Sequence, residues 1–206
     1  MPDLTLQRLM SGATSAIGQR LDISLSDCSH EANMAQLEVA LMLPHTELLA
    51  SQTLVLGAGS SATVLPADFG EMVDVFRVNS FDSFGYRLLT AVPLREIDNA
   101  SEGTATGVAN RYAISANSIV FYPTTTSQDT FTMRYVKVPS DMTALTAKPS
   151  LHTRYHPAVQ YKLTENLADR VVDNQRAAYY RNKFLSVMGS VPSPSDSLNR
   201  SERTYP

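Results

Sequence analysis

The chain has no tryptophan and a single cysteine, Cys28, among its 206 residues. One cysteine cannot form an internal disulfide and cannot by itself build a thiolate metal site. No window approaches the roughly 20 apolar residues of a membrane helix. Residues 1–20 also lack the basic start and apolar run of a secretory signal. We therefore expect a soluble protein with no membrane partner and no targeting signal, suited to a reducing cytoplasm.

The chain also lacks a basic excess, with 17 Lys and Arg against 20 Asp and Glu and a net charge of -3. This argues against a protein whose main function is to bind the phosphate groups of nucleic acids. Residues 1–151 carry 9 basic and 15 acidic side chains, whereas residues 152–206 carry 8 basic and 5 acidic ones. The two parts could therefore face different partners.

Apolar periodicity predicts an N-terminal helical part over residues 1–51. Its first helix spans residues 5–18, capped by Asp3 or Thr5, with apolar positions at Leu6, Leu9, Ala13 and Ile17. Its second helix has Asp27 as the predicted N-cap and ends near Pro44, with Met34, Leu37 and Leu41 on one face. A further turn is expected at residues 45–49.

A period of two predicts an inserted β-lobe over residues 52–139. We expect a hairpin of residues 53–56 and 62–65 around the turn Gly57–Ser61, and pairing of residues 72–78 with 86–90. Further strands are expected at residues 111–115, 118–122 and 130–138. Residues 93–97 form at most a helical turn, and residues 98–109 an exposed loop.

One long helix from about 157 to 187, ended by Gly189, is predicted within residues 140–189 and completes the bundle. The polar tail 190–206 cannot bury enough apolar surface to fold alone, so we expect an extended segment that orders on binding. The predicted fold class is α+β: two N-terminal helices and one long C-terminal helix form a bundle, with an inserted antiparallel β-lobe.

Catalytic and metal-binding patterns are weak. His152 and His156 have zinc-like spacing, but Pro157 biases His156 away from helix, which favours surface or capping histidines. Cys28 lies just before the second helix, and Gly57–Ser61 lacks the lysine and helix of a phosphate loop. The carboxylates Asp68, Glu71 and Asp74 are better explained by turn capping and solvation. We predict no catalytic, cofactor or metal site.

Basic and aromatic side chains are interleaved on the predicted long helix. Tyr and Arg are favoured in protein interfaces, and the same mixture can also meet phosphates or bases. We favour an intersubunit or partner surface over DNA, with an ordinary solvated helix face as a close alternative. The residues concerned are Arg170, Arg176, Tyr179, Tyr180, Arg181, Lys183 and Phe184.

Several segments, taken in order, resemble the head-tail adaptor (connector) proteins of tailed bacteriophages. They are Ala32–Leu49, Leu65–Phe69, Tyr86–Leu88, Tyr112–Ile114, Ile119–Pro123 and Tyr155–Val159. The resemblance implies a structural virion protein of the neck, assembled in the host cytoplasm, with no enzymatic activity and no cofactor. It implies a dodecameric ring that joins the portal protein to a downstream neck or tail protein, with DNA only as passing cargo.

In such a ring the expected contact residues are Arg176, Tyr180, Arg181 and Phe184, with Leu198, Arg203 and Tyr205 in a portal-docking tail. Three alternatives remain at this stage. One is a tail-completion protein or another neck or tail ring component. A second is a metal-dependent hydrolase built on the carboxylates or the histidine pair, and a third is a DNA-binding module on the final helix.

Overall fold

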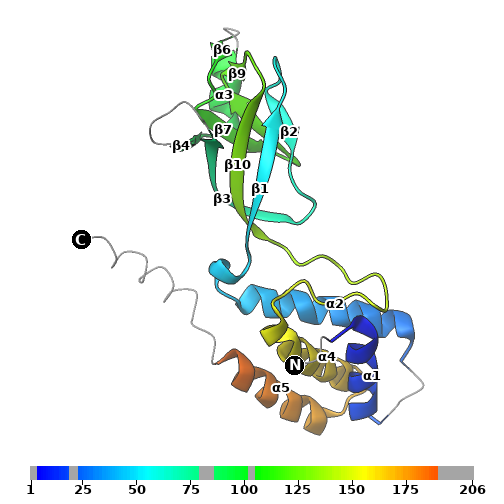
Figure 1. Ribbon diagram of the computed structural model, residues 1–206. Coiled ribbons are helices and arrows are strands. Elements are labelled where there is room, and N and C mark those ends of the chain that lie inside the picture. The colour runs from blue at the N-terminus through cyan, green and yellow to red at the C-terminus, as the bar shows by residue number, and fades with distance from the viewer. Residues whose placement is uncertain (1–3, 19–22, 79–85, 102–104, 190–206) are drawn as a thin grey trace. The chain divides into compact units, whose positions relative to one another are not determined.

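The computed structural model describes residues 4–18, 23–78, 86–101 and 105–189, and it is an α+β protein (Figure 1). The chain divides into two compact units. A helical unit comprises Met1–Leu48 and Val138–Pro206, and a β unit comprises Leu49–Lys137. The β unit is thus inserted between two segments of the helical unit.

The helical unit contains α1 (Leu6–Ala16), α2 (Leu25–Met42), α4 (His156–Arg170) and α5 (Asn174–Met188). Short 3-10 turns cover His45–Glu47 and Thr153–Tyr155. Helix α4 contacts each of the other three helices and lies between α2 and α5 (Figure 1). It carries the centre of this core, with Val159, Leu163 and Leu167 fully buried.

The first predicted helix is confirmed, and its four apolar positions are buried. The Thr5 hydroxyl accepts a hydrogen bond from the Arg8 amide. Close packing explains the glycine at position 12, because a Cβ there would lie 3.0 Å from Nε2 of Gln160 on α4. That same amide donates to the Leu9 carbonyl at 3.1 Å, so α1 and α4 approach closely.

Helix α2 differs from the prediction in its start and in its buried face. Ser24 rather than Asp27 is the N-cap, and its hydroxyl accepts from the Asp27 amide at 3.0 Å. The core side consists mainly of small residues, which let α2 lie close to its neighbours: Cys28, Ala32, Ala35, Val39 and Ala40. Met34 and Leu41, predicted to face the core, are exposed.

The single long C-terminal helix is a wrong prediction, because the chain breaks between α4 and α5. Val172 adopts a left-handed φ of 60°. The Asp173 carboxylate then caps α5 by accepting from the Arg176 amide at 3.1 Å. The apolar stripe continues through the break, so periodicity alone gave no sign of it.

The described residues of the β unit form two four-stranded sheets and a short pair. One sheet has the order β1 (Leu49–Leu56), β10 (Asp129–Lys137), β3 (Phe69–Val78) and β4 (Tyr86–Leu88). The other has the order β2 (Ala62–Val64), β8 (Ser118–Tyr122), β7 (Arg111–Ser115) and β5 (Thr90–Ala91). The short pair is β6 (Thr106–Gly107) with β9 (Thr124–Thr125).

Both four-stranded sheets share one core. Phe121 of β8 stacks on Phe131 of β10 with ring centroids 4.5 Å apart. The predicted alternation of β10 is confirmed, since Phe131, Met133 and Tyr135 are buried. Pairing of β3 with β4 is also confirmed, and the strands predicted at residues 111–115 and 118–122 are present as β7 and β8, which pair with each other.

The predicted hairpin around Gly57–Ser61 is wrong. Strand β1 pairs with β10, and β2 pairs with β8 in the other sheet. A turn-rich sequence fixes a change of direction but not the partner of each strand, so these distant pairings could not be inferred from it.

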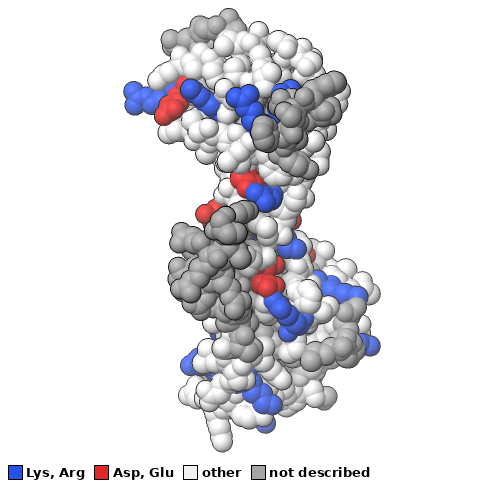
Figure 2. Space-filling view, turned by 60° about the vertical axis from the view of Figure 1, so that its left-hand side comes forward, with Lys and Arg blue, Asp and Glu red and all other residues white. Residues whose placement is uncertain are grey.

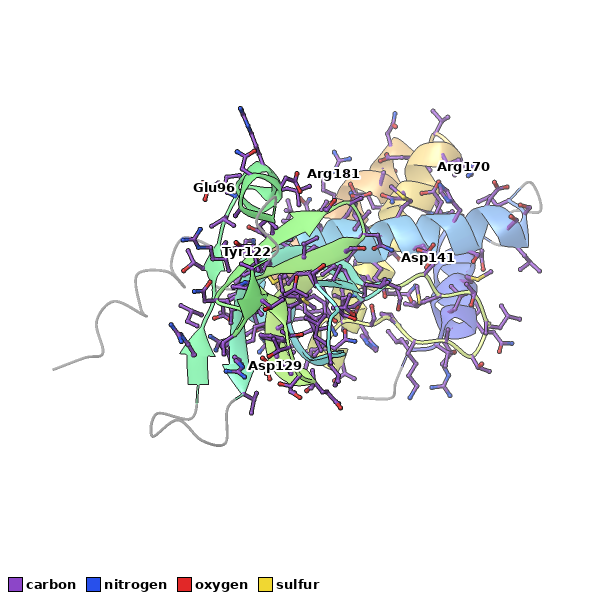
Figure 3. All side chains as sticks on the ribbon, turned by 90° about the horizontal axis from the view of Figure 1, so that it is seen from above. Glu96, Tyr122, Asp129, Asp141, Arg170 and Arg181 are labelled. Atoms are coloured by element: carbon purple, nitrogen blue, oxygen red, sulfur yellow. The ribbon has the colours of Figure 1, made fainter. Side chains whose placement is uncertain are left out.

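Helix α3 (Leu94–Ser101) is longer than the predicted turn and occupies the start of the predicted loop. It lies against β7 and β8. The Tyr122 hydroxyl donates to the Ala100 carbonyl at 3.0 Å, and Figure 3 shows Tyr122 beside this helix.

Candidate subunit interface on the helical unit

One exposed side of α5 combines aromatic and basic side chains. We call Arg176, Tyr179, Tyr180 and Lys183 the tyrosine-arginine face. The Tyr179 and Tyr180 rings meet edge to face with centroids 5.1 Å apart, and Lys183 Nζ lies 4.8 Å from the Tyr179 ring centroid. Tyr179 is 53% exposed. The face thus offers aromatic surface that is already ordered, at low entropic cost to a partner.

A hollow of about 470 Å³ lies beside this face, lined by Ala16, Asp173, Gln175, Arg176, Tyr179 and Tyr180. It is formed where the end of α1 meets the start of α5. Its lining mixes apolar, amide and charged groups, as partner surfaces do.

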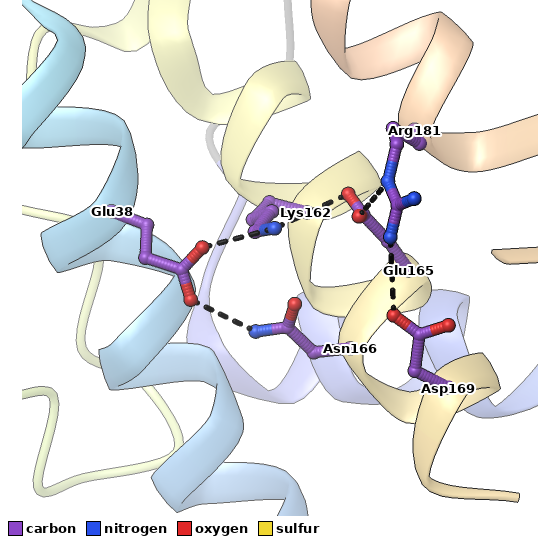
Figure 4. Close-up of polar contacts among 6 residues, drawn as sticks. All are labelled: Glu38, Lys162, Glu165, Asn166, Asp169 and Arg181. Atoms are coloured by element: carbon purple, nitrogen blue, oxygen red, sulfur yellow. Dashed lines mark hydrogen bonds and ion pairs between the residues drawn. The ribbon is translucent and has the colours of Figure 1, made fainter. Parts of the chain in front are cut away.

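Two of the predicted contact residues on α5 make contacts with α4, within the helical unit. Phe184 is 4% exposed, and Lys162 Nζ lies 5.7 Å from its ring centroid. Arg181 donates from Nε to Glu165 Oε1 at 2.7 Å and lies 3.5 Å from Asp169 (Figure 4). This hydrogen bond to Glu165 raises the pKa of the guanidinium. Of the four contact residues predicted on α5, Arg176 and Tyr180 belong to the tyrosine-arginine face. The predicted tail contacts Leu198, Arg203 and Tyr205 lie outside the described residues.

A polar network joins α2, α4 and α5 (Figure 4). The Glu165 carboxylate is only 2% exposed and is paired with Arg181 and, at 3.4 Å, with Lys162. Lys162 also contacts Glu38 of α2 at 2.9 Å, and the Asn166 amide donates to Glu38 at 3.4 Å. The network fixes three helices relative to one another within the unit.

The outward side of α2 is apolar. His30, Met34, Leu37 and Leu41 form what we call the α2 stripe, on the side of the helix opposite Cys28, Ala32, Ala35 and Val39. Leu41 is 77% exposed. Sequence reasoning missed this surface, although one signal was present: α2 is apolar on both sides, which is typical of a helix covered on both sides.

The β unit has its own surface groove, of about 580 Å³, lined by Phe76, Val78, Leu88, Thr132 and Arg134. Arg134 pairs with Asp74, and its guanidinium lies 5.4 Å from the Phe76 ring centroid. The segment that joins β3 to β4, residues 79–85, lies outside the described residues.

The candidate carboxylates do not converge. Asp68 accepts a hydrogen bond from the Tyr135 hydroxyl at 2.9 Å, and Asp74 pairs with Arg134. Glu71 is exposed, at the β3 position opposite Val136. Burial, and then the bond to Asp68, raise the pKa of Tyr135 to about 12. These contacts are structural.

The histidine pair is separated by burial. His152 is exposed and its Nδ1 accepts from the Arg154 amide, as expected for a cap. His156 is buried with Nε2 3.2 Å from the Leu151 carbonyl, and it is the first residue of α4, contrary to the expected bias away from helix and to a surface position. Pro157 is tolerated there because the first helical amides need no partner within the helix.

Cys28 lies within the first turn of α2, not before it, and is buried. Burial, followed by the neighbouring Asp27 charge, raises the pKa of its thiol. Among the residues that the structure describes, no three His, Cys, Asp or Glu side chains are grouped to hold a metal ion.

On the face of the molecule seen in Figure 2, large uncharged areas separate small groups of charged side chains. Among the described side chains drawn there, Lys and Arg lie in separate groups rather than in one continuous basic patch of the kind that binds nucleic acid. No helix in the described part of the chain is long and apolar enough to cross a membrane.

The described residues present candidate contact surfaces on both units, and their carboxylates and histidines do not converge on one site. The family model of the SU10 adaptor protein matches residues 8–205. The chain therefore belongs to the SU10 adaptor family, and it is a phage adaptor protein, as its segments indicated. The comparison with curated proteins gives no match.

Proposed function

We propose that this adaptor forms a ring beneath the portal and joins the portal to the next neck or tail protein around the DNA channel. The family match over residues 8–205 carries the proposal, because it includes both units and the C-terminal tail. An adaptor of this kind needs surfaces for two different neighbours and for its own copies, and it needs no reaction.

The two-unit architecture supports this role. The helical unit offers the tyrosine-arginine face and the α2 stripe, whereas the β unit offers the groove beside Leu88. Separate units with separate surfaces can contact different neighbours at once. The ring in this proposal is a dodecamer in the virion neck, and the DNA passes through it.

The low content of basic side chains fits a channel through which DNA must slide. A surface that neutralised many phosphates would bind DNA and hold it. In this proposal the tail 190–206, with Leu198, Arg203 and Tyr205, docks on the portal, and α5 contributes to contacts between copies.

The test is to mix the purified protein with portal rings of the same particle and to measure mass by light scattering after size exclusion. We expect a stable complex with one adaptor per portal subunit. A variant that lacks residues 190–206 should keep its helical circular dichroism and fail to join the portal. Clean separation of two unaltered species would contradict portal docking and favour a tail-side ring component.

A further inference from the structure

The outer helices of the helical unit carry opposite charge. Helix α2 contains three carboxylates, Asp27, Glu31 and Glu38, and no Lys or Arg. Helix α5 contains three basic residues, Arg176, Arg181 and Lys183, and no Asp or Glu. Helix α4, which lies between them, holds two of each sign (Figure 1). Helices α2 and α5 therefore carry net charges of opposite sign.

Helix α2 also carries the apolar patch that the monomer leaves uncovered. On the α2 stripe, Met34 and Leu41 are exposed and Leu37 is half-buried. Asp27 and Glu31 pair with Arg170, the closest distance being 2.7 Å, and Glu38 pairs with Lys162. These carboxylates are thus fixed along one border of the stripe.

Helix α5 carries an aromatic patch. Tyr179 is exposed between Arg176 and Lys183, and Lys183 Nζ also lies 5.6 Å from the Tyr161 ring centroid of α4. An apolar stripe bordered by acids and an aromatic patch bordered by bases are complementary in chemistry and in charge sign.

We propose that the α2 stripe of one copy packs against the tyrosine-arginine face of the next copy. The occupant of each surface is a second copy of this chain, since the complementary surface is present on the chain itself. Because the stripe and the face are two different surfaces, the contact between them is heterologous; it repeats head to tail and, in the proposed ring, closes on itself. This inference deepens the proposed function and rests on its ring.

Cysteine cross-linking tests the pairing directly. Leu41→Cys and Tyr179→Cys place thiols on the two exposed surfaces, while Cys28 is buried and remains in place. The two variants, mixed in equal amounts with a short bis-maleimide, should give at least tenfold more covalent dimer than either variant alone. A chain with both substitutions should give a ladder of dimers, trimers and larger species.

Leu25→Cys is the matched control. Leu25 is 75% exposed on the same helix, but it precedes Met34 by nine residues and so lies about 180° around the helix. Paired with Tyr179→Cys, it should give the background yield, as should the unmodified chain. Equal yields from like and unlike variants, or no product above this background, would overturn the pairing.

Charge variants test the complementarity. The assembled fraction of Leu41→Lys should be at least tenfold lower than that of Leu41→Glu. The reason is that the lysine would face the basic side chains of α5 in the next copy. Equal losses from the two variants would overturn the electrostatic part of the inference.

Both experiments are run with and without portal rings. A ladder without any portal complex supports the head-to-tail contact and contradicts the proposed position beneath the portal. A portal complex of one copy per portal subunit that gives no cross-link overturns the contact and leaves the proposed function standing.

Discussion

At the scale of single residues, the most consequential contact is the buried Glu165 carboxylate with Arg181. A charge that is 2% exposed depends on its partners, and without Arg181 the Glu165 carboxylate keeps the more distant Lys162, at 3.4 Å, in a poor solvent. Arg181 is itself 55% exposed, so water reaches part of the guanidinium and moderates the loss.

We therefore expect Arg181→Ala to lower the free energy of unfolding, measured by urea denaturation, because the buried Glu165 carboxylate loses its closest cationic partner. Arg176→Ala, on the same helix, is the matched control. Within the described part of the chain, Arg176 pairs with Asp173, 3.4 Å away and at the surface, so its loss should cost at most about 1 kcal/mol. Equal losses from the two variants would contradict the role assigned to the network.

Tyr135 gives the β unit a dependence on alkaline pH. Its pKa is about 12 in the folded protein, above the model-compound value of 10.0. A raised pKa means that the folded state keeps the proton that the unfolded state loses. The stabilisation is therefore fully present below pH 10.0 and is lost as the pH rises towards 12.

Tyr135→Phe should cost about 1 kcal/mol at pH 7, because Asp68 loses its hydrogen bond. The difference from the unmodified chain should shrink above pH 10.0, since only the unmodified chain loses the Tyr135 contribution there. Urea denaturation at pH 7, 9 and 11 measures the difference, and the other tyrosines cancel in it. A difference that stays constant across this range would refute the assigned pKa.

The thiol of Cys28 should resist alkylation in the folded protein. It is buried, and its pKa is raised, so little reactive thiolate is present and the reagent cannot reach it. Iodoacetamide at pH 8 should modify it at least a hundredfold more slowly than in urea-unfolded protein, as followed by mass spectrometry. Similar rates would place the residue at the surface.

At the scale of elements, the break between α4 and α5 concentrates backbone strain at Val172. A β-branched residue at a φ of 60° is unfavourable. Because the Val172 side chain is 76% exposed, its packing contributes little stabilisation to offset that strain. Val172→Gly should raise the free energy of unfolding by about 1 kcal/mol. Ala178→Gly, exposed in the middle of α5, should lower it by a similar amount. Thermal denaturation of both variants measures the contrast, and a loss of stability in both would contradict the strain argument.

The same break marks the limit of sequence inference for the elements. The positions of α1, β7, β8 and β10 follow from periodicity and turn residues, because each has one buried face or a tight turn. The stripe through Leu167 and Val171 predicted one helix, since a left-handed residue leaves no trace in apolar spacing. Helix α2 was oriented wrongly for another reason: small residues facing the core allow close packing, while the large ones face outward.

The candidate interface was predictable only in part. The mixture of Tyr and Arg on α5 indicated a surface, and the structure keeps Arg176 and Tyr180 there. Phe184 was not separable from them by residue type, because its burial depends on how α5 packs on α4. Arg181 pairs with Glu165 although its side chain stays 55% exposed, and residue type does not reveal that pairing either. The α2 stripe emerged only once the buried side of α2 was known.

At the scale of the whole molecule, the β unit is an insertion whose two ends meet. Leu49 at the start of β1 pairs with Val136 near the end of β10. The chain therefore enters and leaves the β unit at neighbouring points, and the unit has its own core built around Phe121 and Phe131. An inserted unit with adjacent ends and its own core is expected to fold without its host.

Residues 49–137 expressed alone should therefore show a cooperative thermal transition and a dispersed amide NMR spectrum. The complementary chain, with a short Gly-Ser linker in place of residues 49–137, should keep the helical circular dichroism of the four-helix unit, since α1, α2, α4 and α5 contact one another without help from the β strands. Arg181→Ala should destabilise the linker chain, and Tyr135→Phe the isolated β unit, as each does the full protein. If either piece fails to fold while the full chain folds, the two units depend on each other, and the β unit is no autonomous insertion.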